Sequence, residues 1–156
     1  MPLKNPLISM LLGVLAMTME LCGYIGLYEW IKPFSPVYAA IVIASALLLF
    51  MPGVAHHVFC GVMEWFYIRL GRTETARRIV TEFFKKTSVT MYACFLGQAI
   101  FAVAFFIAVV TGQTALPPWC CIWNIVIFLV ILAPFKLPGS GNLAGAAMFL
   151  GLSLFI

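Results

Sequence analysis

Residues 7–31 read LISMLLGVLAMTMELCGYIGLYEWI, an apolar stretch of about 25 residues with an acidic side chain, Glu20, near its middle. A helix rises 1.5 Å per residue, so this stretch is long enough to cross a hydrocarbon core of roughly 30 Å. A charged side chain at mid-bilayer costs at least about 2.5–3.5 kcal/mol and is rarely found there without a partner or a function. The stretch therefore predicts a membrane-spanning helix, and Glu20 is the strongest functional candidate in the chain.

The composition extends this prediction from one helix to the whole chain. Hydrophobic residues make up 64% of the 156 residues and charged residues 9%, whereas soluble domains contain roughly 45–50% and 25%. So much apolar surface cannot be buried in one water-facing core. We expect a single domain, residues 1–156, which is an all-α integral membrane bundle of four to five transmembrane helices with one interfacial amphipathic helix. Membrane lipids are its first expected partners.

Four further apolar stretches follow the first. Pro33 and Pro36 predict a turn after it. Pro52-Gly53 predicts a kink in the second stretch, because proline removes a backbone hydrogen bond inside a helix. The five expected spans are residues 7–31, 37–67, 89–110, 119–135 and 142–156.

Residues 72–87 have the pattern of an amphipathic helix. Two oppositely charged pairs with i, i+4 spacing, Glu74/Arg78 and Glu82/Lys86, support a helix on its polar side. The apolar residues recur at i, i+3, i+4, i+7 and i+8, which marks one helix face: Ala76, Ile79, Val80, Phe83 and Phe84. We expect this helix to lie in the lipid headgroups; the alternative is a solvated helix that joins two spans.

The positions of the basic residues predict the orientation of the bundle. With a cytoplasmic N-terminus, only Lys32 lies on the outer side, as the positive-inside rule requires. The other eight Lys and Arg residues then lie on the inner side: Lys4, Arg69, Arg72, Arg77, Arg78, Lys85, Lys86 and Lys136. The net charge of +4 therefore reflects membrane topology, and no nucleic acid partner is expected.

Polar residues inside the expected spans are the candidate site residues. Depth counted along straight helices places Glu20 and Gln98 near the midplane, His56 in the inner half and Asn124 in the outer third. Because the bilayer cannot satisfy these groups, we expect them to face one another or a water-filled cavity. The alternative is that they are ordinary interhelical hydrogen-bonding groups, which contribute about 0.6 kcal/mol on average.

His57 and Glu64 are seven residues apart and share one helix face with Gly53 and Gly61. Buried histidine and carboxyl groups can both titrate near neutrality. This combination suits acid–base chemistry or proton transfer. The predicted catalytic residues are therefore Glu20, His57 and Glu64.

The sequence indicates no metal site and no cofactor. The five cysteines lack Cys-x-x-Cys spacing and are expected to be free thiols. His56 and Cys60 have i, i+4 spacing, but two ligands are weak evidence for a metal. No nucleotide-binding loop, redox motif or haem-ligand pattern is present.

The stretch from about residue 23 to the C-terminus resembles an uncharacterised bacterial multi-pass membrane family, a domain of unknown function. The matching features are Ala55-His56-His57 in an apolar helix, the turn GQTALPPW at residues 112–119, and Asn124 shortly after it. The resemblance implies a bacterial inner (plasma) membrane location and no particular activity.

A fainter similarity is to sterol-isomerase-type membrane proteins, in which intramembrane His, Glu, Trp and Asn residues act on a lipidic substrate. Glu20, His57, Glu64, Trp123 and Asn124 are the residue types that this analogy implies. Together with the polar residues inside the spans, this gives the predicted ligand-binding residues, which are His56, Gln98, Trp123 and Asn124.

Three functions remain open at this point. The first is binding of a hydrophobic or lipidic small molecule in an intramembrane polar pocket, with isomerase-like acid–base chemistry as its enzymatic form. The second is a structural or accessory membrane subunit. The third is a proton-linked small transporter that works as a homo-oligomer.

Overall fold

The computed structural model describes residues 3–137 and 139–155, which form helices joined by short turns and contain no strand. The predicted all-α class is thereby confirmed. The α-helices are α1 (Lys4–Ile31), α2 (Pro36–Arg69), α3 (Glu74–Thr87), α4 (Val89–Val110), α5 (Ile125–Leu132) and α6 (Ser140–Leu152). Two 3-10 helices, η1 (Pro118–Ile122) and η2 (Ala133–Phe135), flank α5.

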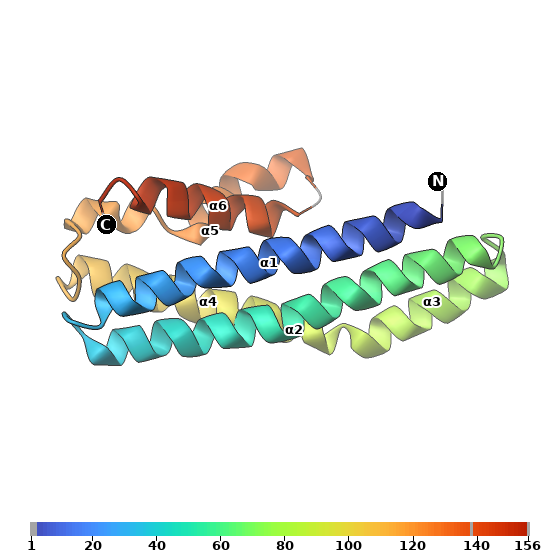
Figure 1. Ribbon diagram of the computed structural model, residues 1–156, viewed down its shortest axis with the longest axis horizontal. Coiled ribbons are helices and arrows are strands. Elements are labelled where there is room, and N and C mark those ends of the chain that lie inside the picture. The colour runs from blue at the N-terminus through green and yellow to red at the C-terminus, as the bar shows by residue number, and fades with distance from the viewer. Residues whose placement is uncertain (1–2, 138, 156) are drawn as a thin grey trace.

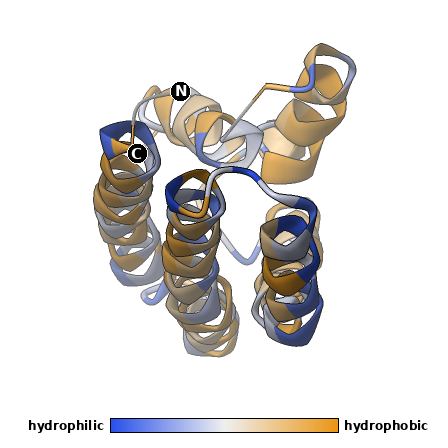
Figure 2. Cartoon of the chain, turned by 90° about the vertical axis from the view of Figure 1, so that its right-hand side faces the viewer, coloured by the Kyte–Doolittle hydropathy of each residue, from blue (hydrophilic) through white to orange (hydrophobic). Residues whose placement is uncertain are grey.

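Three helical segments are long and apolar enough to cross a membrane: α1, α2 and the run Glu74–Val110, which joins α3 and α4. Figure 1 shows these segments side by side, with α6 packed against α1 and α5 packed against α6. Most helical residues are hydrophobic (Figure 2), and many large hydrophobic side chains are exposed, among them Leu11, Met51 and Leu150. These features are compatible with a membrane protein.

The expected fourth and fifth spans are not continuous long helices. Residues 119–135 are divided between η1, α5 and η2, and α6 ends at Leu152. At 1.5 Å per residue, α5 rises about 12 Å and α6 about 20 Å, less than the roughly 30 Å of a hydrocarbon core. The break has a local cause, because Asn124 caps α5 at its start and Pro134 lies in the 3-10 turn at its end.

Helix α2 continues through Pro52 without a break and is 34 residues long. Its second half is accompanied by α3, which runs antiparallel to it (Figure 1). The ring of Phe83 in α3 packs edge-on against Phe59 with centroids 5.7 Å apart, and Phe84 lies 5.8 Å from the ring of His56. The predicted apolar stripe of α3 therefore has α2 as its neighbour, and the position of α3 in the lipid headgroups stays a prediction.

The ion pair on α3 differs from the predicted one. Glu74 binds Arg77 at i+3 with a distance of 2.7 Å, whereas Arg78 was expected as its partner. Hydrogen bonds from Arg77 lower the pKa of the Glu74 carboxyl. Among the described residues, Glu82 and Lys86 form no ion pair.

An aromatic cluster holds α6 against the long helices. Tyr24 of α1 is fully buried, and three phenylalanines pack edge-on around its ring. The centroid distances are 5.2 Å to Phe50, 4.7 Å to Phe101 and 5.2 Å to Phe149. Because these rings come from α2, α4 and α6, the cluster fixes the position of α6 one helical turn from Glu20.

Candidate functional site

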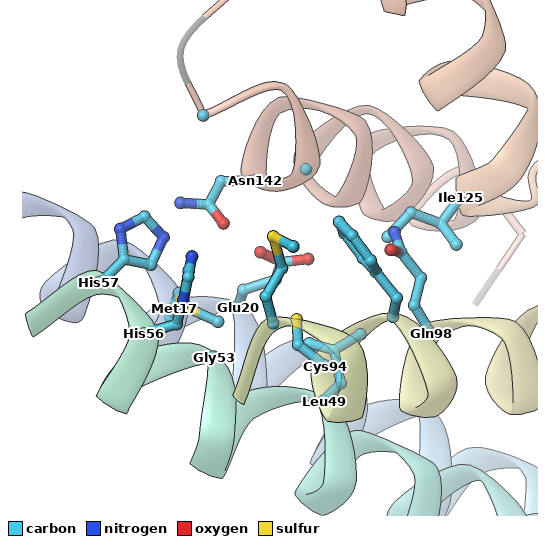
Figure 3. Close-up of a pocket in the computed structure, with 14 residues that line it drawn as sticks. Met17, Glu20, Leu49, Gly53, His56, His57, Cys94, Gln98, Ile125 and Asn142 are labelled. Carbon is cyan, nitrogen blue, oxygen red and sulfur yellow. The ribbon is translucent and has the colours of Figure 1, made fainter. Parts of the chain in front are cut away.

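A cavity of about 220 Å³ lies between α1, α2, α4 and the beginning of α6. Figure 3 shows its polar side chains pointing into a common space. The three long helices and α6 thus bring together residues that are up to about 120 positions apart in the sequence. The polar residues that line it are Glu20, His56, His57, Cys94, Gln98 and Asn142.

Glu20 lies at the centre of this cavity (Figure 3). Helix α6 crosses the carboxyl group so closely that a Cβ atom at Gly145 would overlap the Glu20 oxygens. Within residues 3–137 and 139–155, the Glu20 carboxyl forms no hydrogen bond and no ion pair. A carboxyl group that the protein leaves without a partner is available to a ligand.

The two histidines have different environments. Nδ1 of His56 lies 3.2 Å from Oγ1 of Thr90, and its Nε2 lies 3.5 Å from Sγ of Cys60. His57 instead packs against Gly13 of α1, where a Cβ would approach its Nδ1 to 2.8 Å. Both line the cavity, but His57 has no hydrogen-bond partner among the described side chains and is the freer of the two.

His56 and Cys60 also form the contact considered for a metal. In the part of the chain that the structure describes, no third His, Cys, Asp or Glu residue joins them. Two donors do not complete the four-ligand set of a structural zinc site.

Glu64 lies outside this cavity. It is exposed and lines a separate groove between α2 and α3, together with Tyr67 and Thr81. Seven residues of helix rise about 10 Å, and over that distance the neighbour of α2 on this side changes to α3. The structure therefore separates Glu64 from His57, which the spacing had grouped together.

Asn142 is a cavity residue that the sequence reasoning missed. Its amide lies above the space between His57 and Glu20 in Figure 3. Asn142 falls in the first turn of α6, three residues after Gly139, whose positive φ of 71° begins the helix. Its position in a glycine-rich helix start was the available signal, because such a start allows another segment to approach closely.

Trp123 and Asn124 are used for packing and capping. The Trp123 ring stacks on Phe128 with centroids 5.9 Å apart and contacts Gly151. Asn124 is 5% exposed: its Oδ1 accepts a hydrogen bond from the N–H of Val126 at 3.2 Å. Its Nδ2 donates to the carbonyl oxygen of Ala102 at 2.8 Å. Neither residue lines the cavity around Glu20.

This arrangement predicts the effect of Asn124 on stability. Asn124→Leu removes the cap of α5 and the hydrogen bond to α4, so we expect the free energy of unfolding to fall by about 1–2 kcal/mol. Asn124→Ser keeps a capping oxygen and should lose less. Unfolding in increasing SDS, followed by tryptophan fluorescence, measures both changes, and two variants as stable as wild type would contradict the assignment.

The fold and the cavity together define an all-helical protein with three segments of transmembrane length and one polar cavity between them. The chain belongs to a family of unknown function, DUF6796, whose model matches residues 6–156. Membership in a domain-of-unknown-function family, predicted from the motifs, is confirmed. Neither a curated protein nor a solved structure matches the chain.

Proposed function

We propose that this protein is an integral membrane protein that binds a small hydrophobic or lipidic molecule in the cavity around Glu20. The observation that carries the proposal is the Glu20 carboxyl group, which faces the cavity without a partner among the described residues. It lies in the middle of α1, where water is scarce and an unsatisfied polar group is costly. A bound ligand with a matching polar group would remove that cost.

The size and lining of the cavity support a small ligand. Its volume of about 220 Å³ is below the roughly 300–1,000 Å³ of most drug-sized sites. Met17, Leu49 and Phe95 supply apolar surface between the polar groups. The ligand is therefore a small molecule, or a longer lipidic molecule of which only one end enters the cavity.

Acid–base chemistry on such a ligand would use Glu20 and His57. A protonated carboxyl group can donate a proton, and a neutral histidine on the opposite wall can accept one. Glu64 has no role in this form of the proposal, because it lies in another groove. Recovery of the ligand in an isomerised form would support the enzymatic version.

The proposal includes the orientation of the protein in the membrane. The start of α1 and the turn between α2 and α3 lie at one end of the molecule, and the turn between α1 and α2 lies at the other (Figure 1). Arg69 and Arg72 therefore share an end with Lys4, opposite Lys32. This charge distribution supports a cytoplasmic N-terminus in a bacterial inner membrane.

Native mass spectrometry of the protein in lipid nanodiscs tests the proposal. We expect wild type to retain a stoichiometric hydrophobic ligand and Glu20→Gln to lose it with an unchanged melting temperature, because the amide keeps the shape but not the acid. Glu64→Gln is the matched control, since it makes the same change outside the cavity, and it should retain the ligand.

Two results would contradict the proposal. One is the same ligand at equal occupancy in all three proteins. The other is no ligand in any of them with equal stability, which would favour a structural or accessory subunit.

A further inference from the structure

The charges around the cavity are of one sign. Among the described residues that line it, Glu20 is the only one with a formal charge, and all nine Lys and Arg side chains are exposed. Proteins bind phosphate and carboxylate groups mainly through Arg and Lys. The cavity is therefore unsuited to an anionic ligand.

Neither His56 nor His57 is a counter-ion of Glu20. The ion pairs of the described residues are Glu29–Lys32 and Glu74–Arg77, so neither histidine pairs with Glu20. His56 is directed to Thr90 and Cys60. Within the described part of the chain, the carboxyl group thus lacks the positive partner that an acidic residue inside a membrane normally has.

A positive group on a ligand beside Glu20 would favour the charged form of this carboxyl group. Gly139, Gly141 and Asn142 border the cavity, and the first N–H groups of a helix have no partner within the helix. These groups attract negative charge. A negative Glu20 that faces an open cavity is suited to pair with a positive charge on a ligand.

The remaining lining suits a soft cation. Met17 and Met91 offer polarisable sulfur atoms, and Phe95 offers an aromatic ring. Aromatic rings attract ammonium groups through their faces. We infer that the ligand of this cavity is a small lipophilic cation, such as a substituted ammonium, whose charge pairs with Glu20. This inference rests on the proposed function, to which it adds the charge of the ligand.

Two probes of nearly equal shape test the inference. Benzyltrimethylammonium is cationic, and neopentylbenzene is its neutral isostere, with carbon in place of nitrogen. Equilibrium dialysis of each radiolabelled probe against the protein in phosphatidylcholine nanodiscs measures the dissociation constant of the probe from the protein. We expect wild type to bind the cation at least about tenfold more tightly than the neutral probe, because the ion pair forms in a medium of low dielectric constant.

Three variants identify the site of binding. Glu20→Gln should lose the preference for the cation, and Glu64→Gln should keep it. Gly141→Leu should abolish binding of either probe, because Gly141 lines the cavity and a Cβ there meets no atom within 4 Å, so the leucine side chain has room to occupy the cavity. Gly26→Leu is its control, since Gly26 also has open space around it but lies elsewhere on α1.

The outcomes separate this inference from the proposed function. Equal binding of both probes, abolished by Gly141→Leu, would overturn the inference about charge and leave the cavity as a binding site. A cation preference that persists in Glu20→Gln would also overturn it. Binding of neither probe would overturn it as well. Native mass spectrometry of the co-purified ligand would then test separately whether the cavity binds any ligand.

Discussion

Replacement of Gly97 by leucine is expected to abolish the folded bundle, and replacement by alanine to lower the free energy of unfolding by about 1–3 kcal/mol. Gly97 lies where α4 approaches the backbone of α2. A Cβ atom at this position would lie 2.5 Å from the amide nitrogen of Leu49 and 2.8 Å from the carbonyl oxygen of Ser45.

Backbone atoms cannot move aside as the end of a long side chain can. Relief of the overlap at Gly97 therefore requires α2 and α4 to separate along their contact. The buried rings of Phe50 and Phe101, which pack around Tyr24 from these two helices, would lose their fit. The expected loss has the opposite sign from the ordinary effect of Gly→Ala within a helix, which favours alanine by roughly 1 kcal/mol.

Gly26→Ala is the control for this prediction, because a Cβ there meets no atom within 4 Å. Unfolding in SDS, followed by tryptophan fluorescence, should show Gly97→Ala less stable than wild type and Gly26→Ala as stable or slightly more so. Gly97→Leu should yield no protein with a cooperative transition. If both alanine variants unfold at the same SDS concentration, the close contact between α2 and α4 is wrong.

Replacement of Gly145 by alanine is expected to remove the ligand from the cavity while the bundle stays folded. The added methyl group would occupy the position of the Glu20 carboxyl group. The neighbour in this case is the end of a flexible side chain, which can rotate away at modest cost. We therefore expect a change of less than about 1 kcal/mol in the free energy of unfolding and at least about a tenfold loss of ligand occupancy, because the polar contact at Glu20 is lost.

Gly26→Ala is the matched control, because it lies on α1 outside the cavity. Its Cβ would have open space, so it should keep both stability and ligand. Native mass spectrometry of the two variants in nanodiscs measures the occupancy. Full occupancy in Gly145→Ala would mean that the position of Glu20 beneath α6 does not matter for binding.

The sequence was sufficient for the helical class and for the long apolar segments, and the functional importance of Glu20 stays a prediction. Hydropathy summed over about 20 residues identifies α1, α2 and α4, because the length of a membrane span follows from bilayer thickness. The 3.6-residue period identifies α3 as amphipathic. The motifs around His57 and residues 112–119 indicated the family.

The sequence was insufficient for the two apolar segments at the C-terminal end. A hydropathy sum treats residues 119–135 as one span, whereas the structure begins α5 only after Asn124 caps it. Its short length depends on that cap and on the turn at Pro134. A hydropathy average over many residues contains no information about such local hydrogen bonds and turns.

The composition of the site was decided by tertiary structure. Spacing along one helix grouped His57 with Glu64, but side chains two turns apart can face different neighbouring helices, and here one faces the cavity and the other α3. Asn142 and Gly145 join Glu20 because the aromatic cluster around Tyr24 holds α6 against α1. The sequence determined which helices form and that a carboxyl group lies within one of them. Only the packing of helices distant in sequence decided which groups meet it, since a cavity is a property of several surfaces in contact.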